Sequence, residues 1–182
     1  NMGALSLAKL YRGMVEEKKS HWLQLYRERA VVRCLAETYS ANSIVTDSAA
    51  AASAWGGGQR VNNGTINVTP DGKHLTPLQD KLQKQGIRTG LVSTATITHA
   101  TPAGFAANVN SRGEEKEIAQ QYLDRRVDVL LGGGQKFFSP ELRGKFTAAG
   151  YDVVDSRGAL TKLDHSSFKP LLGVFSDGYH AF

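Results

Sequence analysis

Short apolar runs alternate with amphipathic stretches along most of this chain. The runs at 87–93, 127–131, 151–154 and 171–175 read as strands, the first of them buried, and 43–45 is a shorter run of the same kind. The segments predicted as helices are 4–19, 49–54, 76–85, 101 onward, 114–126 and 139–150. Residues 21–33 fit either a helix or an insertion that contains a strand. Because strands that alternate with helices pair in parallel, the pattern predicts an α/β fold with a mainly parallel sheet between two helical layers.

Composition places the chain among ordinary soluble globular proteins. Of its 182 residues, 41% are hydrophobic and 21% are charged, and no apolar run reaches the length of a membrane span. The net charge of +5 is scattered, with its densest patch near Lys18 and Arg33 and no nucleic-acid motif beside it. We therefore expect a solvated basic face and no nucleic-acid partner. The single cysteine, Cys34, excludes an internal disulfide and a thiolate zinc site.

The segment 45–52 places Ser48 at the start of an alanine-rich helix. A serine in the first turn lies near free backbone N–H groups and the positive end of the helix dipole, which stabilise a phosphate. The plain alternative is a helix cap made by Asp47 or Ser48. Taken alone, the segment favours the cap.

Two later segments add candidate ligands. His99 and Thr101 lie two positions apart in a loop between a strand and a helix, where sheets of this kind place their sites. Imidazole, hydroxyl and water suit a hard or borderline cation, although a turn with capping threonines is the commoner case. Arg112 follows the next helix and is either a surface charge or a bidentate phosphate ligand.

Together, in this order and spacing, these segments resemble the alkaline phosphatases. The family's Thr-Asp-Ser motif followed by small residues is matched at 46–52, and its magnesium loop at His99, Thr101 and Pro102. Its phosphate-binding arginine falls on Arg112, and the resemblance extends over about residues 36–182. It implies a three-layer αβα sandwich around a mainly parallel sheet, of which residues 1–182 are an incomplete catalytic domain. The first strand and the later metal ligands are then expected outside the chain.

The resemblance also implies roles. Ser48 is the nucleophile that forms a phosphoserine, Arg112 clamps the phosphate, and Asp47 orients Arg112 by an ion pair. Ser48, Thr101 and His99 contact metal ions, His99 directly or through water, and the cofactors are two zinc ions and magnesium. Small phosphomonoesters are the expected substrates, a homodimer the expected assembly, and the periplasm or the exterior the expected location, although this chain carries no signal peptide.

Two other functions remain open at this point. One is a phosphodiesterase of the same superfamily, against which the match around Ser48 and the presence of Arg112 argue. The other is a non-catalytic module that binds phosphate or metal, since the chain alone is expected to be inactive.

Overall fold

The computed structural model describes residues 36–164 and 166–179. The chain divides into two compact units, 1–37 and 38–182, and the second holds the elements below. The helix expected at 4–19, the segment 21–33 that fits either a helix or an insertion, and Cys34 lie outside the described residues. In the described part, no helix is both long and apolar enough to cross a membrane.

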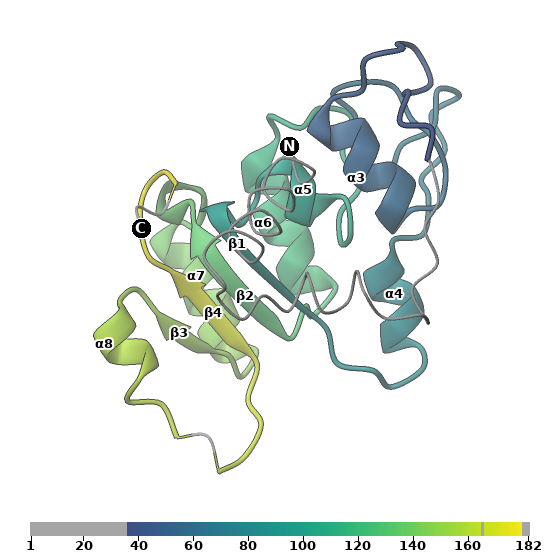
Figure 1. The fold of residues 1–182 in the computed structure, drawn as a ribbon. Helices are drawn as coiled ribbons and strands as arrows, with labels where there is room; N and C mark the ends of the chain where they lie inside the picture. The colour runs from purple at the N-terminus through teal and green to yellow at the C-terminus, as the bar shows by residue number, and fades with distance from the viewer. Residues whose placement is uncertain (1–35, 165, 180–182) are drawn as a thin grey trace, which may run out of the picture. The chain divides into compact units, whose positions relative to one another are not determined.

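A parallel sheet forms the centre of the second unit (Figure 1). Its strands are β1 (Gly90–Thr96), β2 (Val129–Gly133), β3 (Asp152–Val154) and β4 (Leu171–Val174). They lie in the order β1-β2-β4-β3, and all three pairings are parallel. The α/β fold with a parallel sheet is therefore confirmed.

The helices, labelled as in Figure 1, fall close to the predicted segments, apart from α8, which has no predicted counterpart. They are α3 (Ser48–Gly56), α4 (Leu78–Gln83), α5 (Ala100–Ala103), α6 (Glu115–Asp124), α7 (Pro140–Ala148) and α8 (Arg157–Leu160), with a short 3-10 turn at Gln135–Phe137. Helix α7 shows why the local signals succeed. The Ser139 hydroxyl caps it by accepting from Leu142 N, Pro140 fills the first helical position, and Gly150 follows with a positive φ of 94°.

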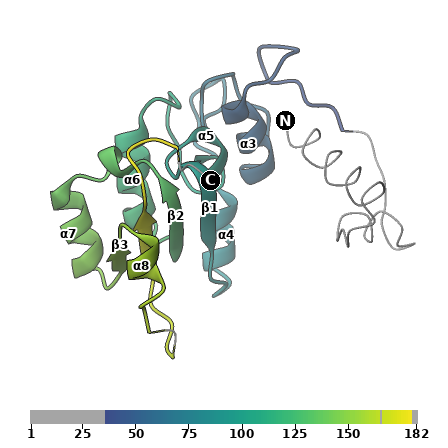
Figure 2. The ribbon, with the colours of Figure 1, turned by 60° about the vertical axis from the view of Figure 1, so that its left-hand side comes forward.

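The core lies on one face of the sheet. Four aliphatic side chains stand in register across the strands on that face, namely Leu91, Leu130, Leu172 and Val153. They pack against α6 and α7 through Ile118, Tyr122 and Phe146, each of which is fully buried. Figures 1 and 2 show α6 and α7 on this side of the sheet.

Helix α8 lies on the opposite face and leaves part of it open. There Val92, Leu131, Leu160 and Phe175 line a cavity of about 380 Å³. Val92 is 75% exposed, so the prediction that 87–93 is a buried strand was wrong in two respects. The strand begins only at Gly90, and among the described residues it is one of the two edge strands of the sheet.

The strand predicted at 43–45 is also absent. Ile44 and Val45 are 91% and 77% exposed, and this segment is irregular. The carbonyl of Val45 accepts a hydrogen bond from the Asn63 side chain, whereas a strand would need a backbone ladder. An apolar triplet without such a ladder has no reason to extend. Helix α8 and the 3-10 turn were not predicted.

Helices α3 and α5 approach each other closely at two glycines. A Cβ on Gly56 would lie 2.0 Å from the Gly104 carbonyl oxygen, and a Cβ on Gly104 would lie 2.5 Å from Ala52 Cβ. Such contacts require backbone movement, so only glycine fits. The contact fixes the helix that begins with Ser48 against the helix that carries Thr101.

We expect Gly104→Ala to destabilise the natural full-length protein by about 1–3 kcal/mol, because the added methyl overpacks the contact with Ala52. Gly144→Ala is the matched control. Gly144 lies inside α7 with open space around its Cβ, so this change should stabilise the protein by about 0.5–1 kcal/mol. Thermal unfolding followed by circular dichroism measures both. Melting temperatures that move in the same direction would contradict the packing argument.

Candidate active site

Asp47 organises the start of α3. Its backbone is extended, and its Oδ1 accepts a hydrogen bond of 2.8 Å from Ala50 N, which makes Asp47 the N-cap. Ser48 is therefore the first helical residue rather than the cap. The Ser48 side chain thus lies at the helix end where the first backbone N–H groups have no helical acceptor.

The second carboxylate oxygen of Asp47 reaches two other segments. Asp47 Oδ2 accepts from Gly64 N at 3.0 Å and forms an ion pair with Arg112 Nη1 at 3.1 Å. Arg112 in turn donates its backbone N–H to Gly64 O at 2.7 Å. The turn at Asn63-Gly64 thus holds the carboxylate and the guanidinium together, although they are 65 residues apart in sequence. One oxygen of the Asp47 carboxylate thus caps the helix, and the other forms the ion pair with Arg112.

Arg112 also contacts His99. Arg112 Nη2 lies 3.1 Å from His99 Nε2. Because a guanidinium can only donate, Nε2 must be the acceptor and the proton of the neutral ring must lie on Nδ1. Partial burial, and then the Arg112 charge, lower the pKa of His99, against a smaller opposing effect of Glu115. The ring is therefore neutral near pH 7.

Tyr179 completes a row of contacts that runs from Asp47 through Arg112 and His99 to Tyr179. The sequence analysis did not identify Tyr179 as a candidate residue. Its hydroxyl lies 3.2 Å from His99 Nε2, and the two rings meet edge to face. It reaches His99 because β2 ends in glycines. A Cβ on Gly133 would lie 1.9 Å from Gly178 O, and Gly134 N donates to Ser176 O at 2.8 Å. The sequence shows three consecutive glycines, 132–134, at the end of β2, but it does not show which segment packs against them.

Thr101 lies in α5, two positions after His99, and its side chain is exposed. The three candidate ligands, Ser48, Thr101 and His99, thus comprise two hydroxyls and one imidazole. With its Nε2 facing Arg112, His99 suits a contact through a metal-bound water better than direct ligation. Within the described ranges, no group of three or more His, Cys, Asp and Glu side chains could hold a metal ion. These donors fit one part of a magnesium site and do not form a zinc site by themselves.

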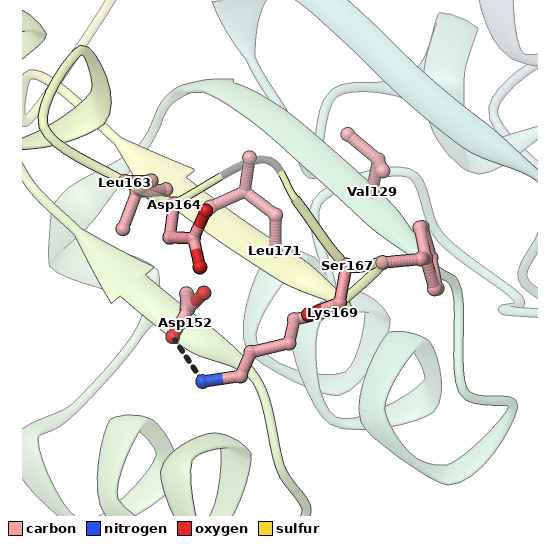
Figure 3. Close-up of a pocket in the computed structure, with 8 residues that line it drawn as sticks. Val129, Asp152, Leu163, Asp164, Ser167, Lys169 and Leu171 are labelled. Atoms are coloured by element: carbon pink, nitrogen blue, oxygen red, sulfur yellow. Dashed lines mark ion pairs between the residues drawn. The ribbon is translucent and has the colours of Figure 1, made fainter.

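Another pocket lies at the amino ends of the strands, away from His99 (Figure 3). It has a volume of about 310 Å³ and is lined by the first residues of three strands, Val129, Asp152 and Leu171. Its carboxylates have partners within the chain. Asp152 lies 3.8 Å from Lys169 Nζ, and Asp164 accepts from the backbone and hydroxyl of Ser166. Ligands of parallel sheets bind at the carboxyl ends of the strands, where His99 lies, so this pocket is not the candidate site.

Known proteins resemble the chain over most of its length. The sequence model of the alkaline phosphatase family matches residues 2–182. The chain is 38% identical over 143 residues to alkaline phosphatase 4 of Bacillus subtilis, which covers 74% of the chain and 30% of that protein.

Solved structures agree with the sequence matches. The crystal structure of Thermus thermophilus alkaline phosphatase superposes with a TM-score of 0.85 at 35% identity, over 97% of this chain and 38% of that one. A variant of the alkaline phosphatase from the Antarctic bacterium TAB5, with aspartate in place of a histidine and with magnesium bound, superposes with a TM-score of 0.72 at 27% identity, over 80% of this chain and 43% of that one.

The chain spans about a third of the length of the relatives that it matches. Within that third, the family match extends from residue 2 to the last residue, and the fold agrees with that of solved family members. The chain belongs to the alkaline phosphatase family.

Proposed function

We propose that the protein containing this chain hydrolyses phosphomonoesters through a phosphoserine at Ser48. The observation that carries the proposal is the Asp47–Arg112 ion pair of 3.1 Å beside a serine at a helix N-terminus. A guanidinium fixed there can bind two phosphate oxygens, while the helix end favours negative charge on the same group. Small phosphomonoesters are the substrates that this arrangement supports.

The reaction has two balanced steps. The Ser48 oxygen attacks phosphorus, a Ser48 Oγ–P bond forms, and the bond from phosphorus to the substrate's alcohol oxygen breaks as the alcohol takes a proton. Water then attacks the phosphoserine, inorganic phosphate leaves, and Ser48 regains its proton. Arg112 binds phosphate oxygens in both steps, and Asp47 keeps its guanidinium in place.

Two zinc ions and magnesium are the cofactors that the family resemblance supports. Bound metal ions supply Lewis-acid stabilisation of developing negative charge and lower the pKa of a hydroxyl. From this chain, Ser48, Thr101 and His99 would contact them, with His99 acting through water, and the other ligands would come from outside the described residues. The magnesium bound in the TAB5 variant supports a magnesium ion in this family.

The whole protein is also proposed to be a homodimer that works in the periplasm or outside the cell. Residues 1–182 then form part of one catalytic domain. These proposals rest on the family resemblance.

Arg112→Ala is expected to lower kcat/KM for a chromogenic phosphomonoester. Losing a bidentate charged contact should remove roughly 2–4 kcal/mol of transition-state binding, which is about 30- to 1000-fold in rate. Inhibition by inorganic phosphate should weaken in parallel, because phosphate uses the same contact. Steady-state kinetics of the natural full-length protein measure both quantities.

Arg88→Ala is the control for this change. The Arg88 guanidinium stacks on the Phe168 ring, 3.7 Å from its centroid, and Arg88 lies just before β1, at the opposite end of that strand from His99. The Arg88→Ala substitution should leave kcat/KM and inhibition by phosphate unchanged. An Arg112→Ala enzyme that kept wild-type phosphate inhibition would exclude Arg112 as the phosphate ligand.

A further inference from the structure

Glu115 connects the two segments that carry His99 and Arg112. It is the first residue of α6 and lies three positions after Arg112. Its Oε2 accepts hydrogen bonds from two threonine hydroxyls, Thr96 Oγ1 at 2.7 Å and Thr98 Oγ1 at 2.6 Å. Lengths of this kind are typical of hydroxyls bound to a carboxylate.

The two threonines lie at the end of β1 and in the loop that follows it and ends with His99. Thr96 is the last residue of β1 and is 5% exposed, while Thr98 immediately precedes His99 and is fully buried. Buried hydroxyls need hydrogen-bond acceptors, and one carboxylate oxygen accepts from both of them. The Glu115 carboxylate therefore fixes the loop on both sides of Ile97.

A second contact from α6 holds the same loop. Tyr122 donates its hydroxyl proton to Ile97 O at 2.9 Å. Burial, and to a lesser extent the charge of Glu115, raises the pKa of Tyr122 well above its usual value, so that this donor stays protonated. Helix α6 thus holds the His99 loop at two points, and Arg112 lies just before the same helix.

Stabilisation of the helix N-terminus by a negative charge does not by itself account for the contacts of Glu115. Acidic residues in a first turn interact favourably with the helix dipole, and Glu117 offers the same charge in the same turn. Glu117, however, accepts from Gln121 on its own helix. Of these two acids, Glu115 is the one bonded to the His99 loop.

We propose that Glu115 is a positioning residue of the active site, which sets the spacing between the Arg112 guanidinium and the His99 loop. The inference rests on the proposed phosphatase function. Glu115 acts through Arg112 and His99 and does not itself contact the phosphate. Without its carboxylate, the two hydroxyls lose their acceptor, the loop shifts, and Arg112 loses the alignment that its 3.1 Å contact with His99 reflects.

The test compares Glu115→Ala and Glu115→Gln with Glu117→Ala in the natural full-length protein. Phosphate affinity is measured by calorimetry, and kcat and KM are measured with a chromogenic phosphomonoester. Misplacement of a substrate-binding group by about 1 Å can cost on the order of 100-fold, so we expect Glu115→Ala to lower kcat/KM by about 10- to 100-fold and to weaken phosphate binding. Glu115→Gln keeps one acceptor oxygen and should retain an intermediate affinity. Glu117→Ala should resemble wild type.

A double variant tests whether Glu115 acts through Arg112. If it does, Glu115→Ala should weaken phosphate binding little further once Arg112 is alanine, because the positioned group is already gone. Phosphate affinities that fall by independent, additive amounts would overturn the proposal, and so would equal behaviour of Glu115→Ala and Glu117→Ala. If Glu115→Ala does not fold, the isosteric Glu115→Gln decides by the same two comparisons. A wild-type protein without phosphatase activity would overturn the proposed function, while the calorimetric comparison would still decide the role of Glu115.

Discussion

Ser48→Ala is expected to abolish phosphoenzyme formation and to lower kcat on the order of 10⁴-fold or more, as the loss of a catalytic nucleophile does in other hydrolases. Alanine keeps the helix and leaves the Asp47 cap intact, because the cap uses Ala50 N and not the Ser48 side chain. The loss should therefore concern chemistry rather than folding. Trapping the full-length enzyme at acid pH with labelled phosphate, followed by peptide mapping, should place the label on Ser48.

Ser43→Ala serves as the control for Ser48→Ala. Ser43 lies in the preceding irregular segment, where its hydroxyl accepts from Val45 N, and the change should leave turnover nearly unaltered. Label recovered on another residue, or an unchanged kcat in Ser48→Ala, would show that Ser48 is not the nucleophile.

Residues 1–182 expressed alone are expected to show no measurable phosphatase activity. Catalysis with several metal ions requires a set of ligands fixed in space. Here the candidate ligands are one imidazole and two hydroxyls, and among the described residues no group of three or more His, Cys, Asp and Glu could hold a metal ion. Without bound metal, the Ser48 hydroxyl stays protonated near neutral pH and is a poor nucleophile.

The assay adds zinc and magnesium to the purified 182-residue chain and follows a chromogenic phosphomonoester. The natural full-length protein, tested in parallel, should hydrolyse the phosphomonoester. Activity of the short chain that disappears in its Ser48→Ala variant would show that these residues carry a complete site and would contradict the expectation.

Local signals predicted most of the fold. The strands at 127–131 and 171–175 and the helices after Ser48 and Ser139 were recognisable because caps, prolines, glycines and short apolar runs act within a few residues. The strand at 43–45 failed for the opposite reason. Whether an apolar triplet extends depends on a backbone partner elsewhere in the chain, and here Asn63 supplies a side chain instead.

The candidate site shows the same division. The motif residues Asp47, Ser48, His99 and Arg112 were visible in the sequence, and the structure brings Asp47, Arg112 and His99 into one row of contacts. Tyr179 was not visible, because it reaches His99 only through the close approach of Gly133 to Gly178. Glu115 could not be identified from the sequence either, since an acidic residue in the first turn of a helix is common. The two threonines that donate to Glu115 lie at the end of β1 and in the loop after it, far from Glu115 in sequence.

The row of contacts from Asp47 to Tyr179 has a consequence for protein synthesis. His99 and Tyr179 are 80 residues apart, so at about 5–20 residues per second a ribosome needs about 4–16 s to pass from one to the other. Ser48 and the helix that follows it are made earlier still. During that interval the nascent chain carries the serine motif without the segment that closes the row. The order of residues along the chain thus delays completion of this row of contacts until the last strand of the described sheet and the loop beyond it have been synthesised.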